Sequence, residues 1–361
     1  MKVGVFGTSL KKNEYRIPIH PKHLLELHDD ILERMYIEEG YADMFGFDIS
    51  TISSKLGGVL TRKELFQSCD VLILPKMCQL DYPQFREGQV IYGWPHCVQG
   101  REITKVAIDK KLTMVAFEAM FSGNGDYKHH IFHKNNEIAG FAAVQHATQI
   151  RGISGYYNGT LKAIVFGFGS TSRGVVHALQ SQGVSDITVF TRRESHLVQQ
   201  QIPGVKYEQF QTVNGKAYDL NGACIAERLS SVDIIANCIL QNPNSPVTFV
   251  EEKDYFNLKP NSIIIDVSCD ENMGFYFAKP TCFDKPGFYV GENKIYYYAV
   301  DHTPSLFWDS SSYQLSLALL PYFSDIFNSK LGYKSSDVLS KAVEIENGKI
   351  LNDAIFKFQK I

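Results

Sequence analysis

A glycine-containing segment, Leu161 to Gly174, constrains the fold of this chain more than any other stretch. Ala163–Phe166 is an apolar run with the length of a buried strand, and Gly167 and Gly169 follow it directly. A helical pattern comes next, and then a second apolar run, Ile187–Phe190. A strand, a glycine turn, a helix and a second strand make half of a dinucleotide-binding βαβ unit. The alternative is a strand-to-helix turn that binds nothing, which the flanking strands disfavour.

The two glycines meet the requirements of a bound pyrophosphate. One permits the tight turn at the strand end, and the other lets backbone N–H groups approach an anion at the positive end of the helix. Ser172 stands where the G-x-G-x-x-G pattern has its third glycine, and Gly174 follows two residues later. We predict that this loop and the first helical turn bind the dinucleotide through Gly167, Gly169, Ser170, Thr171 and Ser172.

The end of the second strand indicates which dinucleotide is bound. An NAD enzyme usually has Asp or Glu there, which accepts a hydrogen bond from the ribose 2′-hydroxyl. Here the strand runs into Thr191, Arg192 and Arg193, and Glu194 comes only afterwards. Two guanidinium groups favour a 2′-phosphate by charge and by fork geometry, so we predict NADPH, with NAD less favoured. An exposed basic turn is the alternative.

The composition is that of a globular enzyme. The 361 residues are 44% hydrophobic and 21% charged, which fits two domains with sizeable cores. A net charge of −3 without a basic stripe argues against nucleic acid as a partner. No apolar run has transmembrane length, and the first residues indicate a strand and a turn, not a signal peptide. The seven scattered cysteines form no C-x-x-C, so we expect reduced thiols and a cytoplasmic location.

The order of the expected elements places the dinucleotide-binding unit in the middle of the chain. A polar segment, residues 122–136, predicts a boundary, Asn214-Gly215 predicts a hairpin, and the pattern is helical from Ser305 onward. We predict an α/β fold of two Rossmann-like domains. Residues 1–134 and 305–361 form a substrate domain, and residues 135–304 form a dinucleotide-binding domain inserted between its N-terminal segment and its C-terminal helical tail.

Four ionisable residues lie beside predicted strand ends or glycine turns, where ligands bind in open α/β sheets. They are Arg16, Lys76, His96 and Asp270. Each residue alone is more often structural or simply exposed. Together, however, an arginine and a lysine suit a carboxylate and an adjacent carbonyl, and a histidine suits proton transfer to a carbinolamine or an imine.

These segments resemble the alanine dehydrogenase/pyridine nucleotide transhydrogenase superfamily. A Glu-x-Arg-x-x-x-x-Pro opening at Glu14–Pro21, the lysine, the histidine, the G-x-G motif and an Asp-Val-x-x-Asp segment occur in the family order. Asp81-Tyr82-Pro83, Gly93-Trp94-x-His96 and Thr303–Leu306 are most similar to the N5-(carboxyethyl)ornithine synthases, which are opine-type reductases. The resemblance covers most of residues 1–325, and residues 330–361 match no pattern that we recognise.

The resemblance implies NADPH-dependent condensation of a pyruvate-like 2-keto acid with the amine of an amino acid similar to ornithine or lysine. Arg16 and Lys76 would hold the carboxylate and the carbonyl of the keto acid, and His96 would be the acid/base catalyst. Asp270 would lie near the nicotinamide ribose and the reacting atoms. His302 stands where the family has an asparagine and is a substrate-binding candidate. We also expect a homo-oligomer.

Two other functions use the same features. An alanine dehydrogenase acting with ammonia, or a saccharopine dehydrogenase-type enzyme working oxidatively, would need the same catalytic set. A regulatory protein that binds a nucleotide without turnover would need only the glycine loop, so the ionisable set disfavours it. His129, His130 and His133 lack an accompanying carboxylate or thiol, so we predict a solvated loop there and no metal.

Overall fold

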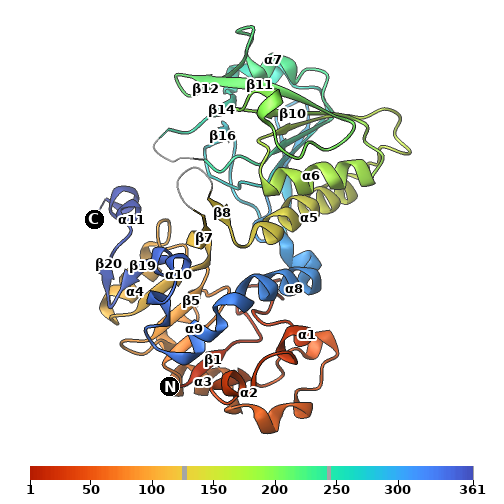
Figure 1. The fold of residues 1–361 in the computed structure, drawn as a ribbon. Coiled ribbons are helices and arrows are strands. Elements are labelled where there is room, and N and C mark those ends of the chain that lie inside the picture. Colours follow the sequence, from red (N-terminus) through yellow and green to blue (C-terminus); the bar gives the residue numbers. More distant parts are fainter. Residues whose placement is uncertain (124–127, 242–244, 361) are drawn as a thin grey trace. The chain divides into compact units, whose positions relative to one another are not determined.

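The computed structural model describes residues 1–123, 128–241 and 245–360, and the chain divides into two compact units. Unit 1 joins Met1–Asn135 to Phe307–Ile361, and unit 2 is the continuous segment Asn136–Leu306 (Figure 1). The predicted α/β fold class, with one Rossmann-like unit inserted into another, is confirmed. In the polar segment that predicts a boundary, residues 124–127 lie outside the described residues.

Unit 1 is built on a sheet with the strand order β20-β19-β6-β5-β4-β1-β2-β3. Strands β1 to β6 are parallel, and β19 and β20 extend one edge in antiparallel fashion. The order reverses between β1 and β4, which is the switch point where ligands bind in such sheets. The strands are β1 (Val3–Val5), β2 (Met35–Glu38), β3 (Gly58–Leu60), β4 (Val71–Ile73), β5 (Val90–Gly93), β6 (Thr113–Ala116), β19 (Val343–Glu346) and β20 (Lys349–Ile350).

Both faces of this sheet are buried. On β4, Val71 and Ile73 pack into one hydrophobic core, whereas Leu72 packs into another on the opposite face. Burial on both faces explains why these strands are continuous apolar runs and do not alternate with polar residues. The covering helices include α1 (Pro21–Leu24), α2 (Asp29–Leu32), α3 (Arg62–Ser68) and α4 (Arg101–Asp109).

The C-terminal tail differs from the helical pattern that the sequence predicts. Between its helices lies the β19–β20 hairpin, in which Asn347 and Gly348 form a two-residue turn with φ of 47° and 75°. Strands of four and two residues are too short to give a clear period-two pattern. The tail helices are α8 (Trp308–Leu319), α9 (Phe323–Asn328), α10 (Asp337–Lys341) and α11 (Asp353–Gln359).

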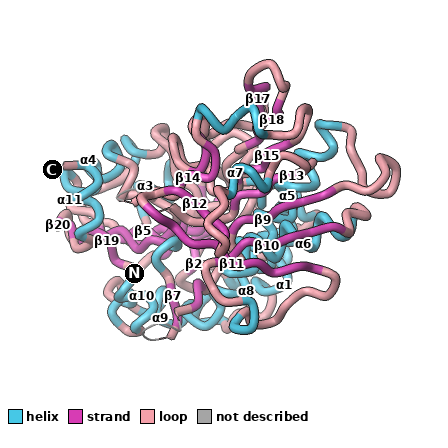
Figure 2. The backbone as a smooth tube through the Cα atoms, turned by 90° about the horizontal axis from the view of Figure 1, so that it is seen from above, coloured by secondary structure: helices cyan, strands magenta, loops and turns pink. Residues whose placement is uncertain are grey.

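Unit 2 has a larger sheet, with the order β16-β14-β12-β11-β10-β9-β13-β15-β18-β17. Its parallel centre, β11-β10-β9-β13-β15-β18, has the Rossmann strand order, with the switch point between β9 and β13 (Figure 2). The predicted hairpin at Asn214-Gly215 is confirmed as the β11–β12 turn. The central strands are β9 (Lys162–Phe166), β10 (Asp186–Thr191), β11 (Val205–Val213), β13 (Ile234–Asn237), β15 (Ile263–Asp266) and β18 (Ile295–Tyr298), and the flanking strands are β12 (Lys216–Asp219), β14 (Thr248–Val250), β16 (Gly274–Phe275) and β17 (Gly287–Val290).

Helices α5 (His133–Arg151) and α6 (Ser170–Ser181) pack closely against each other beside this sheet (Figures 1 and 2). A Cβ atom on Gly174 would lie 1.8 Å from the carbonyl oxygen of Glu137, and one on Gly140 would lie 2.0 Å from that of Thr171. Gly174 therefore permits the close approach of α6 to α5. No helix among the described residues is both long enough and apolar enough to cross a bilayer.

Candidate functional site

The candidate substrate-binding residues of unit 1 lie beyond the carboxyl ends of its parallel strands. Arg16 is in the loop after β1, Lys76 follows β4, and His96 follows β5. A fourth residue, Glu118, follows β6 in the short 3-10 helix Phe117–Ala119. The carboxyl ends of parallel strands share one edge of a sheet, so the topology brings these residues together.

Lys76 and His96 are in direct contact. Nζ of Lys76 lies 2.9 Å from Nε2 of His96, and the backbone N–H of His96 donates to Oε1 of Glu118 at 2.7 Å. The other ring nitrogen, Nδ1, lies 3.4 Å from the same Glu118 oxygen. Because an ammonium group can only donate, Nε2 accepts and the ring proton is placed on Nδ1, facing Glu118. The backbone of His96 is left-handed, with φ of 50°, and the Glu118 contact stabilises this conformation.

Glu118 is the site residue that sequence reasoning missed. Its Oε2 atom is buried and makes no hydrogen bond within the described part of the chain. Burial, followed by the charge of Glu344, raises the pKa of Glu118 to about 8, although Lys76 partly offsets this rise. No motif around Phe117–Ala119 marks the position, and only its place after β6 could have identified it.

Arg16 is buried beside Glu14 and does not have an open guanidinium. Its Nε donates to Oε1 of Glu14 at 2.7 Å, and its Nη2 contacts Oε2 of the same residue. Nη1 donates to Oδ1 of Asn135 at 3.0 Å. These bonds use three of the five donors and leave two outer N–H groups for a carboxylate. Burial of Glu14 opposes its ionisation, but Arg16, with help from Lys76, holds the pKa of Glu14 below its usual value.

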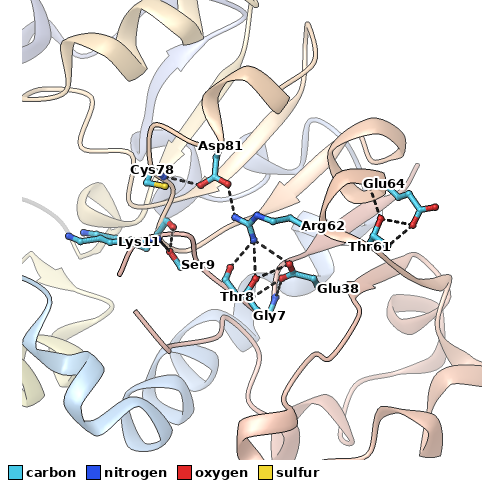
Figure 3. A network of polar contacts seen from close by, with 11 residues as sticks. Gly7, Thr8, Ser9, Lys11, Glu38, Thr61, Arg62, Glu64, Cys78 and Asp81 are labelled. Atoms are coloured by element: carbon cyan, nitrogen blue, oxygen red, sulfur yellow. Dashed lines mark hydrogen bonds and ion pairs between the residues drawn. The ribbon is translucent and has the colours of Figure 1, made fainter. Parts of the chain in front are cut away.

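A polar network fixes the start of the loop after β1 and joins it to Lys76 (Figure 3). At the end of β2, Oε2 of Glu38 accepts from the backbone N–H groups of Gly7 and Thr8, each at 2.8 Å. Arg62 joins this carboxylate to Asp81, donating to Oδ1 of Asp81 at 2.7 Å. The hydroxyl of the next loop residue, Ser9, donates to the carbonyl of Lys76 at 2.8 Å.

The glycine loop of unit 2 fits an anion. Gly167 has a φ of 89°, in the left-handed region, and Gly169 is the N-cap of α6 without a side-chain capping bond. A Cβ on Gly169 would meet no atom within 4 Å, so there is open space beside the first helical turn. Unsatisfied N–H groups at the start of a twelve-residue helix suit a pyrophosphate. Ser172 is fully buried, which leaves Ser170 and Thr171 as the accessible side chains of the predicted set.

The two arginines after β10 have different surroundings. Arg192 lines a cavity of about 680 Å³ together with Gln209, Phe210 and Leu240. Its guanidinium carbon lies 6.0 Å from the centre of the Phe210 ring. Both arginines are exposed, but Arg193 is not among the residues that line this cavity.

Asp270 follows β15 and carries an orphaned atom. Its Oδ2 is buried and has no hydrogen-bond partner among the described residues, and burial raises its pKa. Asp266, the last residue of β15, is fully buried. Its Oδ2 accepts from the Tyr297 hydroxyl at 2.8 Å, and its Oδ1 accepts from the Asn237 amide at 3.0 Å. Burial raises the pKa of Asp266 to about 7.

Two histidine positions remain, His302 and the cluster at residues 129–133. Nδ1 of His302 contacts Oδ1 of Asp301 at 2.6 Å, and its ring packs edge-on against Phe283. In the histidine cluster, the His130 ring packs edge-on against Phe121. The residues that the structure describes contain no group of three or more His, Cys, Asp or Glu that could hold a metal ion.

Comparisons with known proteins find similarity to alanine dehydrogenases and to N(5)-(carboxyethyl)ornithine synthases. The family model "Alanine dehydrogenase/PNT, C-terminal domain" matches residues 140–353. An alanine dehydrogenase of Mycobacterium tuberculosis is 23% identical, covering 98% of this chain and 96% of its own. An N(5)-(carboxyethyl)ornithine synthase of Clostridium botulinum is 27% identical, covering 88% and 92%.

Solved structures give the same fold. An L-alanine dehydrogenase superposes with a TM-score of 0.77 at 17% identity, covering 100% of this chain and 99% of its own. A transhydrogenase from Sinorhizobium meliloti gives a TM-score of 0.69 at 15% identity, covering 98% of this chain and 100% of its own.

Proposed function

Because the chain belongs to the alanine dehydrogenase/PNT family of nicotinamide-dependent oxidoreductases, we propose that it joins a 2-keto acid to the amine of an amino acid, with NADPH as reductant. The predicted family and the prediction of an oxidoreductase are confirmed. The observation that carries the specific proposal is the 2.9 Å contact between Lys76 and His96, with Glu118 behind it. It combines a fixed cation with an oriented acid/base at one strand-end cluster.

Lys76 and Arg16 recognise the keto acid. The two outer N–H groups of Arg16 bind its carboxylate, and the Glu14 ion pair fixes the orientation of this guanidinium. Lys76 donates to the carbonyl oxygen and stabilises the negative charge that develops there as the amine adds.

His96 moves the protons. The carbinolamine formed by addition must lose its hydroxyl as water to give an imine. His96, held beside Lys76 by the contact between Nζ and Nε2, takes the proton that the adding amine loses and returns it to the leaving hydroxyl, while Lys76 stays charged. Glu118 faces Nδ1, and in its ionised form it stabilises the imidazolium form of the ring. A bound dihydronicotinamide supplies the hydride that reduces the imine.

Unit 2 supplies the residues for the dinucleotide. The open space beside Gly169 and the uncapped start of α6 suit its pyrophosphate. Arg192, which lines a cavity at the end of β10, is the candidate for the 2′-phosphate that distinguishes NADPH from NADH. The orphaned Oδ2 of Asp270 is available to accept from a ribose hydroxyl.

Alanine dehydrogenation is the second candidate. Similarity to alanine dehydrogenases over 98% of the chain favours it, and ammonia would then replace the amino acid. The chemistry at Lys76 and His96 is the same in both cases, because both pass through an imine of the keto acid.

The test is a substrate screen with product masses. Purified protein is incubated with NADPH and pyruvate, and with ornithine, lysine, other amino acids or ammonia in turn. The proposal expects NADPH oxidation and an N-(carboxyethyl) amino acid. Oxidation with ammonia alone, giving alanine, identifies the second candidate. If the protein binds NADPH but neither ammonia nor any of the amino acids supports its oxidation, both proposals are wrong.

A further inference from the structure

We propose that the tail helix α11 takes part in positioning the acid/base: the side-chain amide of Gln359 fixes the loop after β5, and Gln359 is a positioning residue for His96. The effect on turnover rests on the proposed function. The attachment of the loop to α11 does not, and it can be measured without substrate.

The loop that carries His96 has an unfavourable backbone conformation. His96 is left-handed, with φ of 50°, which a residue with a side chain keeps only where its surroundings fix it. Its N–H donates to Oε1 of Glu118 at 2.7 Å, and its carbonyl accepts from the N–H of Gly100 at 2.8 Å. The next two carbonyl groups, those of Cys97 and Val98, are bound from outside the loop.

Gln359 binds both of these carbonyl groups. Its Nε2 donates to the carbonyl of Cys97 at 2.7 Å and to that of Val98 at 3.3 Å. The same nitrogen lies 3.2 Å from the hydroxyl oxygen of Thr104 on α4, which itself donates to the Cys97 carbonyl at 2.8 Å. Gln359 is only 4% exposed, so water competes little for these bonds and the amide holds the loop firmly.

Helix α11 has other attachments to unit 1 that do not depend on this amide. Nη2 of Arg101, on α4, donates to the backbone carbonyl of Gln359 at 2.6 Å. Ile355 is fully buried in the same core cluster as Cys97, and the side chain of Asn352 caps the first turn of the helix. Helix α11 therefore gives the amide a fixed support, which a change of the Gln359 side chain leaves in place.

The position of the loop matters because the catalytic contact is short. Nε2 of His96 lies 2.9 Å from Nζ of Lys76, and proton transfer needs the ring within hydrogen-bond distance of the reacting groups. The bonds of Gln359 are to the backbone of the two residues after His96. Gln359 therefore acts on the reaction through that backbone.

The variant Gln359→Met removes the amide and nearly preserves the length of the side chain. The carbonyl of Cys97 keeps its bond from the Thr104 hydroxyl, so the change leaves no buried acceptor there without a partner. We expect this variant to fold.

Gln89→Met is the matched control. Gln89 is buried in the same unit, and its Nε2 donates to the carbonyls of Phe66 and Cys69, each at 2.8 Å. Arg86 also binds both of these carbonyls, so here too each acceptor keeps a partner. Gln89 directly precedes β5, whereas His96 follows the other end of this strand.

Hydrogen exchange tests the attachment without turnover. The full-length protein is transferred to D₂O, and exchange in a peptide spanning residues 94–100 is followed by mass spectrometry at constant pH. In Gln359→Met, the N–H groups of His96 and Gly100 should exchange about tenfold faster or more, because the loop opens more often. Gln89→Met should leave this peptide unchanged. An unchanged rate in Gln359→Met, or equal acceleration in both variants, overturns the proposal.

Kinetics test the positioning role. Gln359→Met should lower kcat by about tenfold, while the Kd of NADPH and the KM of the keto acid stay unchanged, because a reacting group is misplaced and binding is not altered. In a His96→Ala background, the same change should cost nothing more, since the group that it positions is gone. Equal losses in the two backgrounds show a merely structural role and overturn the positioning role. If the wild-type protein oxidises NADPH with neither ammonia nor any amino acid, the proposed function is wrong, and the exchange result still decides the attachment.

Discussion

At the scale of single residues, Lys76 and His96 have separable contributions although they touch. Lys76→Met removes the cation for the carbonyl oxygen, and His96→Ala removes the proton donor. Each variant should lose about 100-fold or more in kcat, the usual range for an acid/base group, and bind NADPH normally because the glycine loop is in unit 2. Steady-state kinetics and fluorescence titration with NADPH measure the two quantities. Near wild-type turnover by His96→Ala across the pH range would assign the proton transfer to another group.

Cofactor preference depends on Arg192, with Arg193 as its matched control. Loss of a charge-assisted contact with a 2′-phosphate should raise the Kd of NADPH by about 10- to 100-fold in Arg192→Ala. Arg193→Ala removes the same charge one residue away, outside the cavity that Arg192 lines, and should change the Kd much less. Calorimetric titrations with NADPH and NADH give both values. Equal losses for the two dinucleotides in Arg192→Ala contradict the assignment.

Asp266 should make the stability of unit 2 depend on pH. Its pKa is raised by burial from an ordinary value of 3.8 to about 7, so the folded state binds the proton more tightly than the unfolded state between these values. The free energy of unfolding therefore falls as pH rises from about 4 to about 7. Asp266→Asn, which cannot ionise, should flatten this slope in urea denaturation at a series of pH values. An unchanged slope means that other groups control it.

The sequence locates Lys76 and His96 because each lies just beyond an apolar run, and such positions converge in a parallel sheet. Arg16 is marked by the Glu14–Pro21 segment. The sequence does not show which neighbouring groups neutralise the charges of these residues. Glu14 largely neutralises Arg16, and Arg16→Ala would leave a buried carboxylate unpaired, so loss of stability would accompany any change in KM. Glu118 has no local signal, since its importance arises from its tertiary contact with His96.

At the scale of elements, the two glycines of α6 have different tasks. Gly174→Ala would force a methyl group to 1.8 Å from a backbone oxygen of α5, so the helices must separate, at a cost of about 1–3 kcal/mol or more. Gly169→Ala meets no protein atom, so stability should stay within about 0.5 kcal/mol while NADPH binding weakens. Thermal denaturation and NADPH titration separate the two effects. A stable Gly174→Ala protein would show that α5 can move freely.

Element prediction succeeded where the burial pattern is strong. The double burial of central strands gives long apolar runs, and Asn214-Gly215 marks a hairpin with its turn chemistry. The hairpin of the tail has the same Asn-Gly signal at Asn347-Gly348. Its strands are too short to stand out between helices, and the bulge at Glu344 breaks the alternation that would have revealed β19.

At the scale of the whole molecule, the units differ in how their cores are assembled. Both cores of unit 2 consist of residues from that segment alone. Residues 136–306 expressed by themselves should therefore fold and bind NADPH. The cores of unit 1 include tail residues such as Leu319, Phe327 and Ile345, so residues 1–135 alone should not fold. Circular dichroism and urea denaturation of both fragments check this. A cooperative transition in fragment 1–135 would contradict it.

The strand order of unit 1 also determines when its edge strands can pair during synthesis. On the ribosome, β6 emerges long before β19, and the whole of unit 2 is translated between them. The inserted unit can finish folding first, while the edge of β6 that later pairs with β19 is still unpaired. An unpaired strand edge is a template for wrong pairing with other chains. A nascent chain halted before Val343 would expose that edge, and it is at this stage that the protein should depend most on chaperones.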